Sequence, residues 1–331
     1  MLLVALVAGT SCRGDERPPA AAPQPETSAE PPAGTIYLRH LRSPSITRID
    51  LATGELTTVS FPELAPGDPP YSMVRAGEKL VVYGGGRTYA LDPELDSRPR
   101  DLGESWYFVP SATTGRVWLM TLDPESPETV RDLAAVREVS VDGRLTLGAS
   151  SRPPSRGPSI LAAVENGLLY QQGDGLSLWN PATGEVTRRL DGPVPIATHG
   201  NLVAWCAAEC PELHVTNMAT GEDAVVRPEA SFAFAETYDG AFSPDGSLLA
   251  VPVLTSDDGH RVAVVDVRQA AGRVVPRSEL SSDYPALAWT PSGDWLLWSA
   301  GGGRLMAAQP GGEAVVLDVR APATFLDIAA G

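Results

Sequence analysis

Short apolar runs of strand length recur along this chain from Ile36 onward, separated by polar turns that contain Gly, Asn or Asp. The prominent runs begin near residues 36, 79, 116, 167, 201, 247 and 294. The 258 residues between the first and the last, divided over six intervals, give a mean spacing of 43 residues. No segment keeps a helical period, and Thr129–Val136 would form at most two helical turns within a loop. The pattern predicts an all-β fold built from repeats.

One turn sequence occurs three times, as Asp50–Glu55, Asn180–Glu185 and Asn217–Glu222, each ending in Ala-Thr-Gly-Glu. In each copy we expect the first residue to cap the turn through its side chain and the Gly to supply a positive φ. A second turn type precedes other strands, as Phe-Ser-Pro-Asp-Gly at 242–246 and Trp-Thr-Pro-Ser-Gly at 289–293. Both turn types indicate hairpins between short strands.

A period of about 43 residues with four strand-length segments per unit is typical of a β-propeller blade. The count gives seven blades over residues 34–331. The first unit has only three strands, and the strand at Ala323–Ala329 has no partner of its own, so we expect this C-terminal strand to close blade one. Two β-sandwiches are the alternative, and the constant spacing argues against them.

The two turn types resemble those of bacterial extracytoplasmic β-propellers of the WD40-like and TolB-type class. The resemblance covers about 290 residues. It implies the fold and very little about function. The Gly-His and Trp-Asp pairs of eukaryotic WD repeats are absent from this sequence.

The N-terminus has a different composition. Residues 1–12 form an apolar run that ends in small residues and Cys12, which resembles a bacterial lipoprotein signal whose Cys is lipidated, although Gly9 stands where that signal prefers Leu. The alternative is a short apolar N-terminus with an incidental Cys. Residues 13–33 are rich in Pro, Ala and Glu and predict a disordered tether. The chain is therefore predicted to be exported and lipid-anchored on the outer face of the bacterial cytoplasmic membrane.

The positions of the other two cysteines fit an exported protein. Cys206 and Cys210 lie between the second and third strands of blade five, where a disulfide is the expected state of an exported protein. Half of a metal site is the alternative, and only His214 is near enough to contribute. Cys12 is then the odd cysteine.

Charge and motif content narrow the function. The formal charge of −16, from 25 Lys and Arg against 41 Asp and Glu, argues against a nucleic-acid partner. The four His are scattered among the blades, and no Gly-x-Ser-x-Gly motif occurs. We therefore predict a monomeric, non-catalytic binding platform for an envelope protein or glycan, with no cofactor, metal or catalytic residue. The alternative is a propeller enzyme, such as a sugar or quinone-cofactor dehydrogenase or a lyase.

A ligand is predicted to bind at the channel mouth, on the face opposite the repeated turns, where the loops are irregular. The candidate ligand-binding residues are four Tyr at blade entrances and two neighbouring Asp: Tyr71, Tyr107, Tyr238, Tyr284, Asp239 and Asp283. Such a ring could stack on a sugar or hold a cationic side chain. The alternative is that each Tyr fills the gap between adjacent blades.

Overall fold

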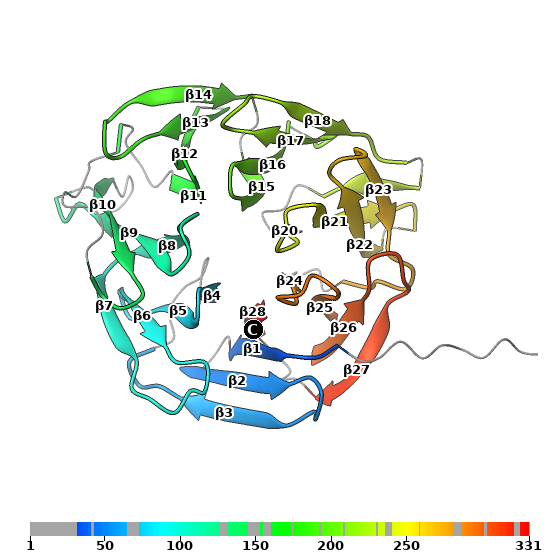
Figure 1. Ribbon diagram of the computed structural model, residues 1–331, viewed down its shortest axis with the longest axis horizontal. Coiled ribbons are helices and arrows are strands. Elements are labelled where there is room, and N and C mark those ends of the chain that lie inside the picture. Colours follow the sequence, from blue (N-terminus) through cyan, green and yellow to red (C-terminus); the bar gives the residue numbers. More distant parts are fainter. Residues whose placement is uncertain are drawn as a thin grey trace, which may run out of the picture. The chain divides into compact units, whose positions relative to one another are not determined.

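The computed structural model describes residues 32–40, 43–64, 73–125, 132–144, 153–154, 160–173, 175–191, 194–207, 209–229, 231–235, 240–257, 259–280, 286–300, 303–320 and 325–330. Residues 32–331 form one compact unit. The described residues contain no α-helix and arrange their strands as seven small antiparallel sheets around a ring (Figure 1). The predicted seven-bladed β-propeller is confirmed.

Each blade runs outward from an innermost strand. Blade one contains β28 (Phe325–Ala330), β1 (Thr35–His40), β2 (Ser45–Asp50) and β3 (Leu56–Ser60). Blade two contains β4 (Met73–Ala76), β5 (Lys79–Gly84), β6 (Arg87–Leu91) and β7 (Arg100–Glu104). Blade three has three described strands, β8 (Tyr107–Pro110), β9 (Arg116–Leu122) and β10 (Leu133–Ser140).

The remaining blades follow the same plan. Blade four contains β11 (Ile160–Val164), β12 (Gly167–Gln172), β13 (Gly175–Trp179) and β14 (Val186–Leu190). Blade five contains β15 (Val194–His199), β16 (Leu202–Cys206), β17 (Leu213–Asn217) and β18 (Asp223–Val226). In blade six, β19 (Phe232–Phe234) and β20 (Ala241–Phe242) both pair with β21 (Leu248–Thr255), followed by β22 (His260–Asp266) and β23 (Ala271–Val274). Blade seven contains β24 (Leu287–Trp289), β25 (Leu296–Ala300), β26 (Arg304–Ala308) and β27 (Val315–Arg320).

The last strand closes the ring as expected. β28 pairs with β1 in antiparallel register, with Ala330 opposite Ile36 and Ile328 opposite Leu38. The sheet order β28-β1-β2-β3 makes the C-terminal strand the innermost strand of blade one (Figure 1). This pairing covers the inner edge of β1, which would otherwise have no strand partner.

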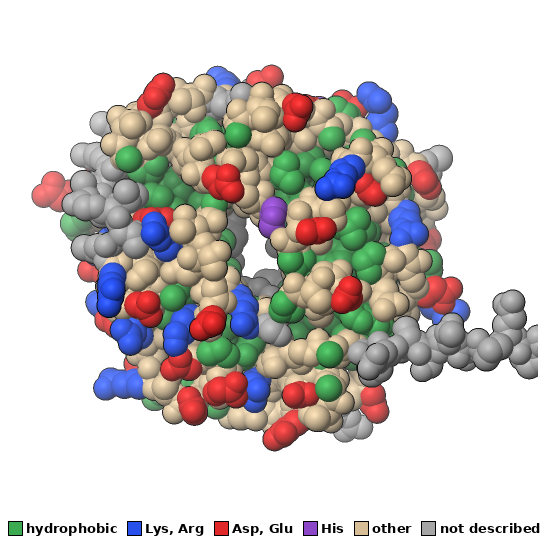
Figure 2. Space-filling model, viewed as in Figure 1, with side chains coloured by type: hydrophobic (Ala, Val, Ile, Leu, Met, Phe, Trp, Pro, Cys, Tyr) green, Lys and Arg blue, Asp and Glu red, His purple; other side chains and the backbone are tan. Residues whose placement is uncertain are grey.

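The middle strands are apolar on both faces because a blade is covered on both sides by its neighbours. β9 shows this clearly: Val117 and Leu119 pack into the core shared with blade two, while Trp118 and Met120 pack into the core shared with blade four. Figure 2 shows hydrophobic side chains around the ring, a central opening, and acidic and basic groups scattered over the face in view.

The three Ala-Thr-Gly-Glu turns form the same hydrogen bonds. In blade four, the Asn180 side chain accepts from the Ala182 and Thr183 amides at 2.9 and 3.3 Å, and Gly184 has φ +76°. Asp50 and Asn217 accept from their own turns in the same way. These turns join third to fourth strands, while the Pro-containing turns join first to second strands. Because the strands alternate in direction, both types emerge on one side of the ring, here called the turn face.

One local expectation was wrong. Residues 133–136, expected to lie in a loop with at most two helical turns, belong to β10, which pairs with β9 from Leu133 to Ser140. Residues 129–131 lie outside the described part of the chain. Cross-strand pairing and burial of Leu133 and Val136 outweigh the weak helical preference of this segment.

Candidate functional site

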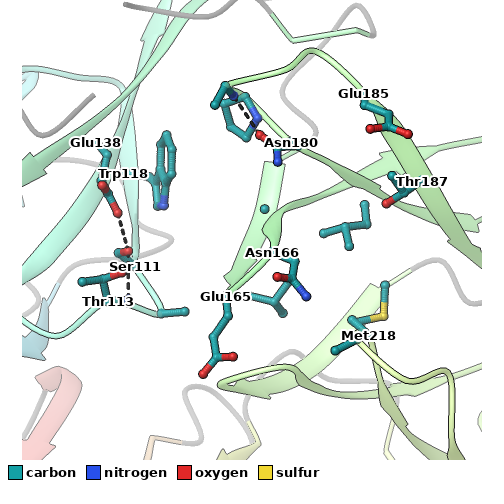
Figure 3. A pocket seen from close by; sticks show the side chains of 17 residues that line it. Ser111, Thr113, Trp118, Glu138, Glu165, Asn166, Asn180, Glu185, Thr187 and Met218 are labelled. Atoms are coloured by element: carbon teal, nitrogen blue, oxygen red, sulfur yellow. Dashed lines mark hydrogen bonds between the residues drawn. The ribbon is translucent and has the colours of Figure 1, made fainter. Parts of the chain in front are cut away.

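A cleft of about 530 Å³ opens on the turn face between blades three, four and five (Figure 3). Four turns contribute to it: β8–β9, β11–β12, β13–β14 and β17–β18. The strands β9, β10 and β14 supply further side chains. Its volume lies within the range of pockets that hold small organic ligands.

Trp118 and Glu138 form the wall on the side of blade three. They are directly paired across β9 and β10, so their side chains project from the same face of the sheet. Trp118 is 7 % exposed and Glu138 is 5 % exposed. Ser111 Oγ donates to Glu138 Oε1 at 2.6 Å, and Arg116 Nη1 donates to Glu138 Oε2 at 3.1 Å. Arg116 therefore compensates the charge of this carboxylate, and the Ser111 hydrogen bond, drawn in Figure 3, helps to fix its position.

The β11–β12 turn supplies Glu165, Asn166 and Gly167 to the cleft. Gly167 has φ +153°, and an ideal Cβ built there would lie 2.3 Å from the carbonyl oxygen of Trp179. Only glycine allows the turn to approach β13 this closely. Beside this turn, the Asn201 side-chain amide donates to Glu165, which ties the turn to blade five. Asn166 is exposed at the rim.

Two of the Ala-Thr-Gly-Glu turns also border the cleft. They belong to the adjacent blades four and five, and they place Ala182 and Glu185 from one copy beside Met218 and Ala219 from the other. Met218 is buried, while Ala182 and Glu185 are exposed. The capping bonds of Asn180 and Asn217 hold both turns rigidly, so the rim has a fixed shape.

The described lining carries negative charge only. It includes Glu138, Glu165 and Glu185, and none of the described residues that line the cleft is Lys or Arg. Such a lining repels anions and favours neutral or cationic polar ligands. Groups of three or more His, Cys, Asp or Glu that could hold a metal ion do not occur among the described residues. No helix in the described part of the chain is long and apolar enough to cross a membrane.

The predicted ring of Tyr is only partly described. Tyr107 is 8 % exposed, packs in the core between blades three and four, and donates its hydroxyl to the Ile160 carbonyl of β11 at 3.0 Å. It therefore fills a gap between blades. The other five candidates lie outside the described residues: Tyr71, Tyr238, Asp239, Asp283 and Tyr284. A ligand-binding role for the ring stays a prediction.

Cys206 and Cys210 form a disulfide, with their Cα atoms 4.9 Å apart. Their sulfurs are therefore not available as thiolate ligands, and the nearby His214 bonds instead to Asp223 at 2.8 Å and stacks on Trp205. Cys12 and the predicted signal and tether, up to residue 31, lie outside the described residues.

Sequence reasoning missed the cleft because it treated the regular turns as scaffold and expected a ligand on the opposite face. The available signal was the occurrence of two turns in consecutive blades, at 180–185 and 217–222, that differ only at their second residue. Neighbouring blades with matching turns bring those turns side by side on one face. The Trp118–Glu138 pair could not be read without the β9–β10 register.

No known protein family matches the chain, and no curated protein matches it either. Solved structures match in fold. AztD from Citrobacter koseri is 10 % identical with a TM-score of 0.52, covering 90 % of this chain and 98 % of that one. TolB from Acinetobacter baumannii is 14 % identical with a TM-score of 0.51, covering 90 % and 66 %. A Bacteroides fragilis protein, provisionally named a 6-phosphogluconolactonase, is 15 % identical with a TM-score of 0.56, covering 93 % and 100 %. At these identities the likeness shows the fold, and the predicted TolB-like β-propeller is confirmed.

Proposed function

We propose that this chain is a non-catalytic binding module of the bacterial cell envelope. In this proposal the propeller is exported, held by a lipid at Cys12 on the outer face of the cytoplasmic membrane, and monomeric. It receives an envelope protein or glycan in the cleft between blades three, four and five. The observation that carries the proposal is a rigid, polar cleft whose wall contains the buried Trp118–Glu138 pair.

The engagement of Glu138 supports binding over catalysis. A general acid or base must exchange its proton with a reacting group. The Glu138 carboxylate instead pairs with the Arg116 guanidinium and accepts the Ser111 hydroxyl proton in a hydrogen bond. These bonds stabilise a fixed anion, which suits a group that positions a ligand. Ser111 in turn is held by this bond and by the Thr113 amide at 3.1 Å.

Two features support the proposed export and lipid anchoring. The Cys206–Cys210 disulfide is the kind of bond that persists in oxidising compartments outside the cytoplasm. Cys12 follows an apolar run with small residues, as a lipidated Cys does in the signal that it resembles. Stable anchoring would require more than one acyl chain on this residue.

Matched variants test the role of the cleft. Ala182 and Ala52 occupy the same exposed position in copies of one turn, but only Ala182 borders the cleft. The full chain and the variants Ala182→Arg and Ala52→Arg would be immobilised and exposed to separated protein and glycan fractions of a bacterial envelope. Retention of one component by the wild type and Ala52→Arg, with loss in Ala182→Arg, is expected. Equal retention by all three, or by none, would overturn the role of the cleft.

The recovered component also tests the enzyme alternative. A binding module returns its ligand chemically unchanged, whereas a sugar or quinone-cofactor dehydrogenase or a lyase would return an oxidised or cleaved product. Mass spectrometry of the eluted ligand decides between these outcomes.

The lipid anchor has its own test, in which mass spectrometry of envelope-purified protein should find acylated Cys12 as the first residue. An unmodified Cys12 still preceded by residues 1–11 would remove the anchor from the proposal.

A further inference from the structure

We infer that the cleft binds a neutral, hydroxyl-rich ligand, the edge of a glycan, by placing a ligand hydroxyl between the Trp118 indole N–H and the Glu138 carboxylate. This inference rests on the proposed binding function and names its ligand class. It rests on the juxtaposition of a buried donor and a buried acceptor at the cleft wall.

The first observation is the indole N–H of Trp118. This side chain is more than nine-tenths buried and lines the cleft, and Figure 3 shows its ring edge at the cleft wall. Among the residues that the structure describes, none accepts a hydrogen bond from Nε1. This atom also keeps some exposed surface, because it is not among the fully buried polar atoms that have no partner. The N–H is therefore unpaired and not fully buried, and because Trp118 lines the cleft, a ligand acceptor bound there can reach it.

Three other tryptophans have an indole hydrogen-bond acceptor, whereas the indole N–H groups of Trp179 and Trp295, like that of Trp118, have none among the described residues. Trp205 Nε1 donates to Thr216 Oγ1 at 2.8 Å, Trp289 Nε1 to the Ala241 carbonyl at 2.9 Å, and Trp298 Nε1 to the Glu279 carbonyl at 3.0 Å. A largely buried indole normally finds such a partner. Trp118 differs from Trp179 and Trp295 in that it lines the cleft.

The second observation is the acceptor beside this donor. Glu138 is the cross-strand partner of Trp118, and directly paired residues have Cβ atoms about 4.5–5.5 Å apart. The carboxylate is fixed by Ser111 and Arg116 at the same wall. A hydroxyl is the neutral group that accepts from an N–H while donating to a carboxylate. Sugars carry such hydroxyls in adjacent pairs.

Charge excludes the competing ligand classes. An anion would meet Glu165 and Glu185 with no Lys or Arg among the described lining residues, and Glu138 already has Arg116 as its ion-pair partner. An ammonium or guanidinium group carries donors only, so it leaves the Trp118 N–H unsatisfied. The ring edge of an indole is also its positive side, which disfavours a cation there. A neutral hydroxyl satisfies both groups.

The rim of the cleft adds further groups that suit a neutral, hydroxyl-rich ligand. Asn166 and Thr187 are exposed, and each carries a side chain that both donates and accepts hydrogen bonds. Ala182 and Ala219 are exposed at this rim and provide an apolar surface against which a C–H face of a sugar ring can pack. The cleft volume of about 530 Å³ accommodates more than one sugar ring.

Calorimetric titration of the full chain tests the inference. The neutral probes are chitotetraose, maltotetraose and cellotetraose, and the cationic probes are spermidine and a Lys-rich hexapeptide. At least one neutral tetrasaccharide should bind with a Kd below about 10 mM. Its affinity should change little between about 50 and 500 mM salt, because no charge on the ligand is screened.

Two variants locate the binding. Trp118→Phe and Glu138→Gln should each weaken binding about five- to tenfold, the usual effect of losing one hydrogen bond. Tyr107→Phe is the matched control, since Tyr107 lies in the same core as Trp118 but donates to Ile160 rather than to the cleft. It should bind as the wild type does. Because Trp118→Phe could disturb packing, Ala182→Arg, at an exposed rim position, serves as an independent block.

The outcomes separate the two proposals. Failure of all neutral probes, or binding that is unchanged in Trp118→Phe, Glu138→Gln and Ala182→Arg, overturns the hydroxyl inference. If envelope fractions are still retained in an Ala182-dependent way, or a cationic probe binds with strong salt dependence, the binding function stands with another ligand class. If no probe binds and no envelope component is retained, both proposals fail.

Discussion

Ala330 pairs with Ile36 across β28 and β1, so the last strand of the chain is the innermost strand of the blade that holds its first strand. The two ends of the propeller are thereby joined by backbone hydrogen bonds. The stability of the whole ring depends on this seam, because β28 is also in contact with β4 and β24 of the flanking blades.

Removal of residues 325–331 should open the ring. The β28–β1 ladder has five paired positions, and each backbone hydrogen bond contributes about 1 kcal/mol net. A loss of several kcal/mol should lower the Tm by roughly 10 °C or more. Removal of residues 1–31 is the control and should leave the Tm nearly unchanged. A truncated C-terminus that melts with the wild type would contradict the closure.

Gly167→Ala should destabilise the protein more than Gly184→Ala does. Gly184 has φ +76° with no atom within 4 Å of an added Cβ, so alanine there incurs only the left-handed backbone cost of about 1–2 kcal/mol. At Gly167 the added Cβ also meets the Trp179 carbonyl, which adds roughly 1–3 kcal/mol of steric strain. Urea unfolding midpoints of the two variants measure the difference. Equal midpoints would show that the β11–β12 turn tolerates a side chain.

The Asp245 turn should make the stability of the folded protein depend on pH in the acid range. Hydrogen bonds from the Ser243 hydroxyl and from Ser247 lower the pKa of Asp245 from 3.8 to about 2. Because this pKa is depressed in the folded state, the stabilisation is complete above about pH 4 and is lost as the pH falls toward 2. The wild type should therefore exceed Asp245→Asn in stability at neutral pH, and the gap should close over that window.

The control is Asp294→Asn in the equivalent turn of blade seven. Asp294 bonds to Ser292 through its backbone N–H, a bond that the substitution leaves in place. Urea midpoints measured between pH 2 and 7 report both comparisons. A gap between wild type and Asp245→Asn that persists unchanged at pH 2 would show that the carboxylate charge does not stabilise the turn.

The Cys206–Cys210 disulfide should contribute modestly to stability. It closes a very short loop, for which chain entropy predicts about 2 kcal/mol. Reduction should lower the Tm by about 5 °C. The double variant Cys206→Ala with Cys210→Ala should show no further change with reductant. Thiol titration of the unfolded protein should find two ring thiols only after reduction, and two free thiols beforehand would contradict the disulfide.

The parts of this protein that could be predicted are those fixed by local chemistry or by the period. The Asn180 and Asn217 turns were predicted because an Asx side chain and a Gly with positive φ determine their shape within six residues. Seven blades and the closing strand followed from spacing and from counting unpaired strands. The disulfide followed from the three-residue gap between Cys206 and Cys210, in the connection between two predicted strands.

The cleft depends on relationships that the sequence does not display. Its wall exists because the β9–β10 register places Glu138 opposite Trp118. The sequence did not predict that these two segments pair, so it could not predict their register. Its rim exists because turns of three successive blades meet on one face. Tyr107 shows the same limit, since whether an aromatic side chain at a blade entrance faces the channel or the next blade is decided by packing.

The most direct test of the cleft as a binding site is the indole region of a ¹H–¹⁵N correlation spectrum. The chain has seven Trp, and the cross-peak that is missing in Trp118→Phe identifies the Trp118 N–H. On titration with the neutral tetrasaccharide that binds by calorimetry, this cross-peak should move in a saturable way, because its open N–H gains an acceptor. A titration in which the Trp118 cross-peak stays in place while the ligand binds would contradict the account.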